Sequence, residues 1–201
     1  MKILNLYAGI GGNRKLWGSE HEITAVEYDP NIAKMYQDLY PQDEMVVGDA
    51  HQYLLENFKD FDFIWSSPPC PTHSRMIFLL NQKETYQLKY PDMSLYQEII
   101  ILEKLYKGFY VVENVISYYD PLIEPQRSGS HYFWSNFEIP VLSDTDRKKV
   151  RNDKGYTLAK KMEDKDIFIE DFYDYKGDKR TLLNNAIEPE LGKLILESLP
   201  M

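Results

Sequence analysis

The sequence predicts an α/β protein in which a mostly parallel, doubly wound sheet carries helices on both faces. Between residues 2 and 115, short β-type runs alternate with helical patterns. Strands that alternate with helices in this way form parallel sheets. Each predicted strand is also followed, or ended, by glycine, carboxylate or thiol residues. Ligands of such sheets bind at the carboxyl ends of the strands.

The elements follow one another in a regular order. Strands are predicted over residues 2–8, 22–29, 45–50, 60–67 and 108–115, and one or two more over 131–142. Helices are predicted from residue 13 and over residues 30–40, 51–58, 93–106 and 185–199. Pro30 suits the first position of a helix, and residues 93–106 are strongly amphipathic. We expect a single domain over residues 1–201.

Composition limits the function classes. The one cysteine among 201 residues excludes an internal disulfide, and no Cys/His cluster has zinc spacing, so we expect a reducing, cytoplasmic compartment and no metal. We see no signal-peptide pattern and no apolar run long enough to span a membrane, so no membrane partner is expected. The net charge of -9 argues against a protein that coats nucleic acid non-specifically, although a local basic groove is compatible with it.

The regular pattern loosens after about residue 120. Residues 143–180 hold a basic cluster followed by an acidic run from Glu163 to Asp178. Two interpretations stay open: a solvated insertion with charged faces, or a small element that contacts the substrate. The basic cluster consists of Arg147, Lys148, Lys149, Arg151, Lys154, Lys160 and Lys161.

The first three strands end in residues that suit a nucleoside ligand. The glycines of AGIGGN permit close backbone approach, although a plain tight turn explains them as well. Glu27 ends the second strand and offers two acceptor oxygens to ribose hydroxyls, which also fits a dinucleotide enzyme. Asp49 ends the third strand, where it either accepts from an adenine amino group or caps the next helix.

The fourth and fifth strands end in residues that suit nucleophilic chemistry. Cys70 follows two prolines, which give its thiol a rigid approach direction. A lone cysteine is also commonly a small buried hydrophobe. Glu113 ends the neighbouring strand, with Asn114 placed to orient it. A thiolate that attacks C6 of cytosine needs an acid at N3 of the ring, and Glu113 fits that role.

These motifs, in this order, resemble the DNA cytosine-5 methyltransferase family. LYAGIGG, VEYD and GDA resemble its three S-adenosylmethionine motifs. SPPCPTHS resembles the catalytic Pro-Cys motif, ENV the catalytic glutamate motif and LLNNAIEPELGKLI the C-terminal motif. The resemblance covers residues 1–137 and 182–199 and implies a Rossmann-like methyltransferase fold. It implies double-stranded DNA with a flipped cytosine as substrate.

The resemblance also assigns residues to roles. Cys70 would be the nucleophile, Glu113 the N3 partner, and Ser74 and Arg75 the start of a mobile loop that closes over the flipped base. The residues that it places around S-adenosylmethionine are Tyr7, Gly9, Gly11, Gly12, Glu27, Tyr28, Asp49, Ala50, Pro69 and Asn185.

The chain departs from the family in two places. The arginine-rich motif after ENV is reduced to residues 126–131, so either Arg127 or His131 would contact the cytosine. The target-recognition region shrinks to residues 143–180, where Lys148, Lys149 and Arg151 would contact phosphates. A short target, or a separate specificity protein, follows from this, and the small size suits a phage or restriction-modification enzyme.

Three alternatives compete with a DNA methyltransferase. The first is a non-catalytic subunit that binds the cofactor or DNA, and the second is a cytosine-5 methyltransferase that acts on RNA. The third is an exocyclic-amino methyltransferase. The stretch Ser67-Pro68-Pro69-Cys70 shares the double proline of that third class but lacks its polar acceptor and its stacking aromatic.

Overall fold

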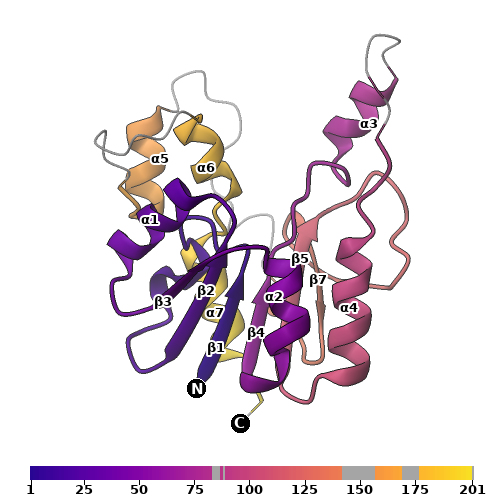
Figure 1. Ribbon diagram of the computed structural model, residues 1–201. Coiled ribbons are helices and arrows are strands. Elements are labelled where there is room, and N and C mark those ends of the chain that lie inside the picture. Colours follow the sequence, from indigo (N-terminus) through magenta and orange to yellow (C-terminus); the bar gives the residue numbers. More distant parts are fainter. Residues whose placement is uncertain (83–86, 88, 142–156, 169–176, 201) are drawn as a thin grey trace.

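The computed structural model describes residues 1–82, 87, 89–141, 157–168 and 177–200. Within these ranges a seven-stranded sheet has the order β3-β2-β1-β4-β5-β7-β6 (Figure 1). The five strands from β3 to β5 are parallel, and β7 pairs antiparallel with both β5 and β6. The prediction of a mostly parallel, doubly wound sheet is confirmed.

Most of the elements lie close to where the sequence predicts them. The strands are β1 Lys2–Leu6, β2 Glu22–Glu27, β3 Glu44–Val47, β4 Phe63–Ser66, β5 Phe109–Val115, β6 Gln126–Ser128 and β7 His131–Ser135. The helices are α1 Pro30–Leu39, α2 Ala50–Asn57, α3 Arg75–Asn81, α4 Ser94–Leu105, α5 Leu158–Lys165, α6 Lys179–Asn185 and α7 Pro189–Glu197. Two short 3-10 turns are η1 Asn13–Leu16 and η2 Phe58–Asp60.

Local chemistry explains where the first helices begin. The Asp29 carboxylate accepts a hydrogen bond from the backbone N–H of Asn31, and Pro30 occupies the first turn of α1. Both features favour a helix start. Asp49 caps α2 in the same way. All four residues of β4 are buried, as expected of a central strand covered on both faces.

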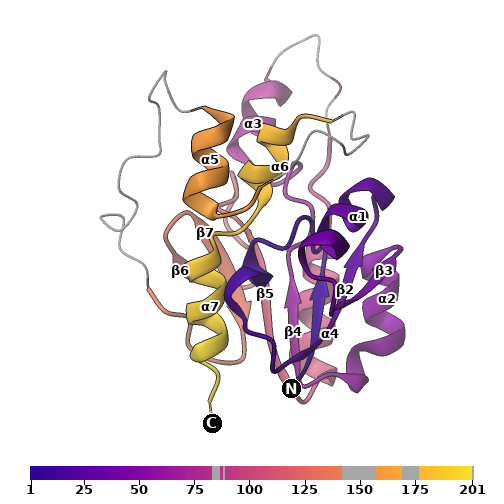
Figure 2. The same ribbon diagram turned by 90° about the vertical axis from the view of Figure 1, so that its left-hand side faces the viewer.

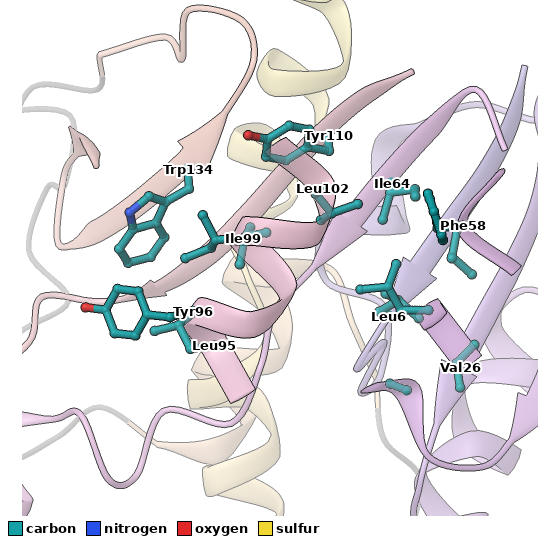
Figure 3. Close-up of a cluster of buried hydrophobic side chains, with 14 residues drawn as sticks. Leu6, Val26, Phe58, Ile64, Leu95, Tyr96, Ile99, Leu102, Tyr110 and Trp134 are labelled. Atoms are coloured by element: carbon teal, nitrogen blue, oxygen red, sulfur yellow. The ribbon is translucent and has the colours of Figure 1, made fainter. Parts of the chain in front are cut away.

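Helices cover both faces of the sheet. In Figure 1, α2 and α4 lie in front of the strands and α7 lies behind them. The front face forms a core in which the α4 side chains Leu95, Tyr96, Ile99 and Leu102 meet sheet residues (Figure 3). Tyr96 and Trp134 lie edge to face in it, with ring centroids 6.2 Å apart. Behind the sheet, the Trp17 ring packs on Trp65 of β4, and its indole N–H donates to the backbone oxygen of Gly192 in α7. Figure 2 shows α7 on this side of the sheet.

The structure differs from the prediction at both ends of the chain. The helix expected from residue 13 is only the four-residue 3-10 turn η1, because Gly18 turns the chain with φ of 80° shortly after it. The helix expected over residues 185–199 is divided into α6 and α7. Ala186 leaves the helical conformation, with ψ of 124°, and Pro189 begins the second helix.

The predicted insertion is described only in part. In the described ranges α5 packs on α6, and Leu158, Met162 and Ile167 join Ile10 and Met35 in an apolar cluster beside α1. Residues 142–156 and 169–176 lie outside the described residues, and the cluster members Lys148, Lys149 and Arg151 fall there. None of the described helices is long and apolar enough to cross a membrane.

Gly192 offers a test of how η1 docks on α7. A Cβ atom at this position would lie 2.2 Å from the backbone oxygen of Asn13. Glycine to alanine in a helix interior normally stabilises by up to about 1 kcal/mol. We predict that Gly192→Ala instead lowers the free energy of unfolding by about 1–3 kcal/mol, the scale of overpacking. Urea unfolding would measure the change.

The exposed neighbour Lys193 provides the control for this measurement. Lys193→Ala should change the free energy of unfolding by about 0.5 kcal/mol or less, as surface substitutions do. A stabilised Gly192→Ala protein would contradict the close packing of α7 on η1.

Candidate active site

The candidate site lies at the carboxyl edge of the sheet, where the parallel strands end together. Leu6 of β1 pairs with Ser66 of β4, and Ser66 pairs with Val112 of β5. The strand order reverses between β1 and β4. Such a reversal opens a crevice in which doubly wound proteins bind ligands. The glycine loop after β1, the Pro-Cys turn after β4 and the end of β5 therefore adjoin.

The glycine loop combines left-handed backbone with open space. Gly9 and Gly11 have φ of 55° and 73°, and Tyr7 has φ of 54°. A Cβ atom at Gly9 would meet no heavy atom within 4 Å, whereas one at Gly11 would lie 2.3 Å from the Tyr40 ring. A Cβ atom at Gly12 would lie 2.4 Å from a backbone oxygen of the segment before α7. Gly9 thus faces free space, while Gly11 and Gly12 serve packing.

Glu27 holds this loop through its side chain. Its Oε2 atom accepts from the backbone N–H of Gly9 at 3.0 Å, and its Oε1 atom accepts from the N–H of Asp29 at 2.9 Å. Each carboxylate oxygen has a second lone pair, so both oxygens can still accept from hydroxyl groups. Tyr28, the next residue, is 77% exposed and leaves its ring face free for stacking.

Asp49 caps helix α2, which is one of the two roles that the sequence left open for it. Its Oδ1 atom accepts from the backbone N–H groups of His51 and Gln52, at 2.9 and 3.2 Å. Asp49 also borders a cavity of about 220 Å³ at this edge of the sheet. The lining residues of the cavity are Tyr7, Asp49, His51, Pro68, Pro69, His73, Asp92, Ser94 and Leu95.

Three predicted cofactor residues, Tyr7, Asp49 and Pro69, thus line one cavity. Ala50 is buried in the first turn of α2 and does not line it. Asn185 is exposed at the end of α6 and does not line it either.

Cys70 lies in a tight turn directly after the cavity residue Pro69. Its backbone oxygen accepts from the N–H groups of His73 and Ser74, at 3.0 and 3.2 Å, which fixes the turn. The thiol is half-buried. Burial raises the pKa of the Cys70 thiol, and the negative charge of Glu113 raises it further. The thiol is therefore protonated at neutral pH.

Glu113 is a buried acid on the strand next to the turn. The residue is 7% exposed, and burial raises the pKa of its carboxyl group to about 7. A hydrogen bond from Ser67 lowers the pKa in part, and the indole N–H of Trp65 holds the Ser67 hydroxyl at 2.8 Å. A carboxyl group with this pKa can donate a proton near neutral pH, as a general acid must.

Asn114 contacts the Pro-Cys turn rather than Glu113. Its Nδ2 atom donates to the backbone oxygen of Pro68 at 3.0 Å, and its Oδ1 atom accepts from the N–H of Val115. Ser67, which sequence reasoning missed, is the residue that contacts Glu113. Its place in the Ser-Pro-Pro-Cys stretch was the available signal.

The structure brings His131, and not Arg127, to Glu113. The Nε2 atom of His131 lies 3.7 Å from Oε1 of Glu113. Arg127 is exposed on the edge strand β6. It pairs with Tyr132 of β7, and Tyr132 pairs with Asn114 of β5, so Arg127 and Asn114 share one face of the sheet. Side chains of successive residues alternate between the faces of a sheet. Arg127 thus lies on the face opposite to Glu113, and of the two candidate residues it is His131 that lies beside this carboxyl group.

The predicted mobile loop begins with a short helix. Ser74 caps α3, and Arg75 is its first residue. Ser74 also forms a β-bridge with Ser117. Figure 1 shows α3 rising above the carboxyl edge, with α5 and α6 above the other side of the sheet. The exposed apolar side chains of α3 are Met76, Phe78 and Leu79.

The part of the chain that the structure describes contains no set of metal ligands. No group of three or more His, Cys, Asp or Glu residues there is placed to hold a metal ion. The chemistry of the described edge is that of a thiol, a buried carboxyl group and a polar cavity.

The strand order, with its reversal between β1 and β4, defines a Rossmann-like, doubly wound α/β fold. The chain belongs to the C-5 cytosine-specific DNA methylase family, whose model matches residues 1–118. This match spans the glycine loop, Cys70 and Glu113.

The similar proteins cover this chain only in part. The type II methyltransferase M.Bsp6I of Bacillus sp. (strain RFL6) is 31% identical over 77 residues, which is 37% of this chain. The chain covers 24% of the length of that relative.

Two solved structures are also similar. One is a mutant of Spodoptera frugiperda DNMT2, at 28% identity and a TM-score of 0.39, covering 57% of this chain and 35% of that one. The other is the hypothetical protein TTHA0928 of Thermus thermophilus, at 18% identity and a TM-score of 0.45, covering 67% and 73%.

The electrostatic interaction between Cys70 and Glu113 predicts how the thiol reacts with an alkylating agent. Glu113→Gln removes the negative charge that raises the thiol pKa, so Cys70 should react faster at pH 8 than in the wild type. The midpoint of the rate against pH should also fall. Alkylation by iodoacetamide, followed by mass spectrometry between pH 6 and 10, measures this directly because Cys70 is the one cysteine of the chain.

Glu138→Gln is the matched control, since Glu138 is exposed. It should leave the rate profile of Cys70 unchanged. An unchanged or slower reaction in Glu113→Gln would show that the two groups do not interact.

Proposed function

We propose that this chain transfers a methyl group from S-adenosylmethionine to C5 of cytosine in DNA through a covalent Cys70 adduct. The observation that carries the proposal is the position of the Cys70 turn, which follows β4 next to the end of β5, where the buried Glu113 raises the pKa of the thiol. Pro69, which precedes the thiol, lines the cavity beside the glycine loop. Family membership supports the same reaction.

The residues of the edge fit S-adenosylmethionine. Glu27 offers acceptors to the ribose hydroxyls, Tyr28 an exposed ring to the adenine, and Gly9 free space beside the backbone. Asp49 and Pro69 border the cavity that would receive the adjoining part of the cofactor. The cofactor supplies a methyl group on a positively charged sulfur.

The protein side chains perform the remaining chemistry. The Cys70 thiol loses its proton to solvent, and the resulting thiolate forms a bond to C6 of cytosine while Glu113 gives a proton to N3, which makes C5 nucleophilic. A protonated Glu113 also removes the charge that opposes the thiolate. After methylation, water takes the C5 proton, the C5–C6 double bond forms again, the Cys70 sulfur leaves C6 as a thiolate, and N3 returns its proton to Glu113. His131, beside Glu113, is placed to contact the base.

DNA would lie across the carboxyl edge, between α3 and the α5–α6 pair. Ser74 and Arg75 begin the element above Cys70, and Lys160 and Lys161 on α5 are the members of the basic cluster that the structure describes. Reading several base pairs requires several base-edge contacts. Because the predicted recognition region spans only residues 143–180, we propose a short target, or specificity supplied by a separate protein. We also propose that the chain forms a single domain.

Covalent trapping tests the proposal. DNA that contains 5-fluorocytosine should form a denaturation-resistant adduct with the wild-type protein in the presence of S-adenosylmethionine, because fluorine at C5 cannot leave as a proton does. Cys70→Ala should form no adduct and transfer no methyl group. It should bind the cofactor within about threefold of the wild type, a difference of less than about 1 kcal/mol, since Cys70 does not line the cavity.

The same trapping experiment with different substrates distinguishes a DNA methyltransferase from an RNA methyltransferase and from a non-catalytic subunit. Equal amounts of double-stranded DNA, single-stranded DNA and RNA with the same base modification would be offered to the protein. Trapping on RNA alone would favour the RNA substrate, and absence of an adduct with every substrate, despite cofactor binding, would favour a non-catalytic subunit.

A further inference from the structure

Glu98 is a buried carboxylate that the proposed chemistry does not use. It lies in α4 between Leu95 and Leu102, which face the apolar core, and its side chain is 0% exposed. An apolar residue at this position would extend the core without the cost of burying a charge. The role of this carboxylate therefore has to be inferred from its hydrogen bonds.

Three donors converge on Glu98. Its Oε1 atom accepts from the Tyr7 hydroxyl at 2.5 Å and contacts Nδ1 of His51 at 3.0 Å. Its Oε2 atom accepts from the Ser66 hydroxyl at 2.6 Å. Tyr7 follows β1, Ser66 ends β4, and His51 lies in the first turn of α2, after β3. One carboxylate thus joins the ends of three parallel strands.

The bond to Tyr7 holds a strained backbone. Tyr7 is a non-glycine residue with φ of 54°, a conformation that persists only where its surroundings impose it. Two residues later, the N–H of Gly9 donates to Glu27. Release of the Tyr7 hydroxyl would therefore disturb the glycine loop and the orientation of Glu27.

The same network reaches the cavity wall. Tyr7 and His51 both line the cavity, together with Asp49 and Pro69. The hydrogen bond to Glu98 raises the pKa of His51. The charged groups that act on His51 are Glu98 of α4, Asp49 at the start of α2, and Asp92 before α4. All three carry negative charge and favour protonated His51.

We propose that Glu98 is a positioning residue of the cofactor site, which holds Tyr7 and His51 in the cavity wall and makes cofactor affinity depend on pH. The inference rests on the proposed function. Protonated His51 binds Glu98 most firmly, so affinity should be highest at low pH and fall as pH rises through the raised pKa of His51.

Calorimetric titration with S-adenosylhomocysteine between pH 6 and 9 tests this. Glu98→Gln keeps the shape of the side chain but leaves one acceptor oxygen for three donors. It should weaken binding by about tenfold or more, the scale of a lost hydrogen bond to a charged group, and flatten the pH profile. Tyr7→Phe should weaken binding and keep the profile, whereas His51→Asn should flatten the profile.

Glu103→Gln is the matched control, because Glu103 lies on the same helix and is exposed. It should bind as the wild type does. Folded Glu98→Gln protein with the affinity and pH profile of the wild type would overturn the inference and leave the proposed function standing. If Glu98→Gln does not fold, wild-type behaviour of both Tyr7→Phe and His51→Asn would overturn it. Wild-type protein that binds no S-adenosylhomocysteine would refute the proposed function itself.

Discussion

The parallel pairing of β4 between β1 and β5 is the constraint on which the rest of the site depends. With Ser66 opposite both Leu6 and Val112, the turn that follows β4 lies between the glycine loop and the end of β5. Pro69 then borders the cavity, and Cys70 comes within the electrostatic influence of Glu113. A sheet in any other order would separate these groups, so the fold supplies the proximity on which the proposed chemistry relies.

The two buried carboxyl groups at this edge, Glu98 and Glu113, differ in their hydrogen-bond partners. Glu98 receives three donors, which suits an anchor that stays in place. Glu113 has Ser67 and His131 as neighbours, and burial raises its pKa to about 7. A group in the second situation can change protonation near neutral pH. The contrast supports an anchoring role for the first carboxyl group and acid chemistry for the second.

The sequence predicts what depends on local pattern, and fails where distant pairing decides. Gly9, Glu27, Cys70 and Glu113 could be placed at strand ends because hydrophobic runs and glycine or proline turns mark those ends. The choice between Arg127 and His131 depends on the antiparallel register of β5 with β7, which local pattern does not set. Local pattern also did not show that Asn114 contacts Pro68 while Ser67 contacts Glu113, because the direction of each side chain depends on the neighbouring strands. Glu98 left one sequence signal, a charge on the apolar face of residues 93–106.

The most direct measurement is a crystal structure of the chain with bound S-adenosylhomocysteine. The account predicts the ligand in the cavity lined by Tyr7, Asp49 and Pro69, with its ribose hydroxyls on Glu27 and its sulfur directed toward the side of Cys70. A ligand bound away from this cavity, or one that leaves Glu27 without a contact, would contradict the account.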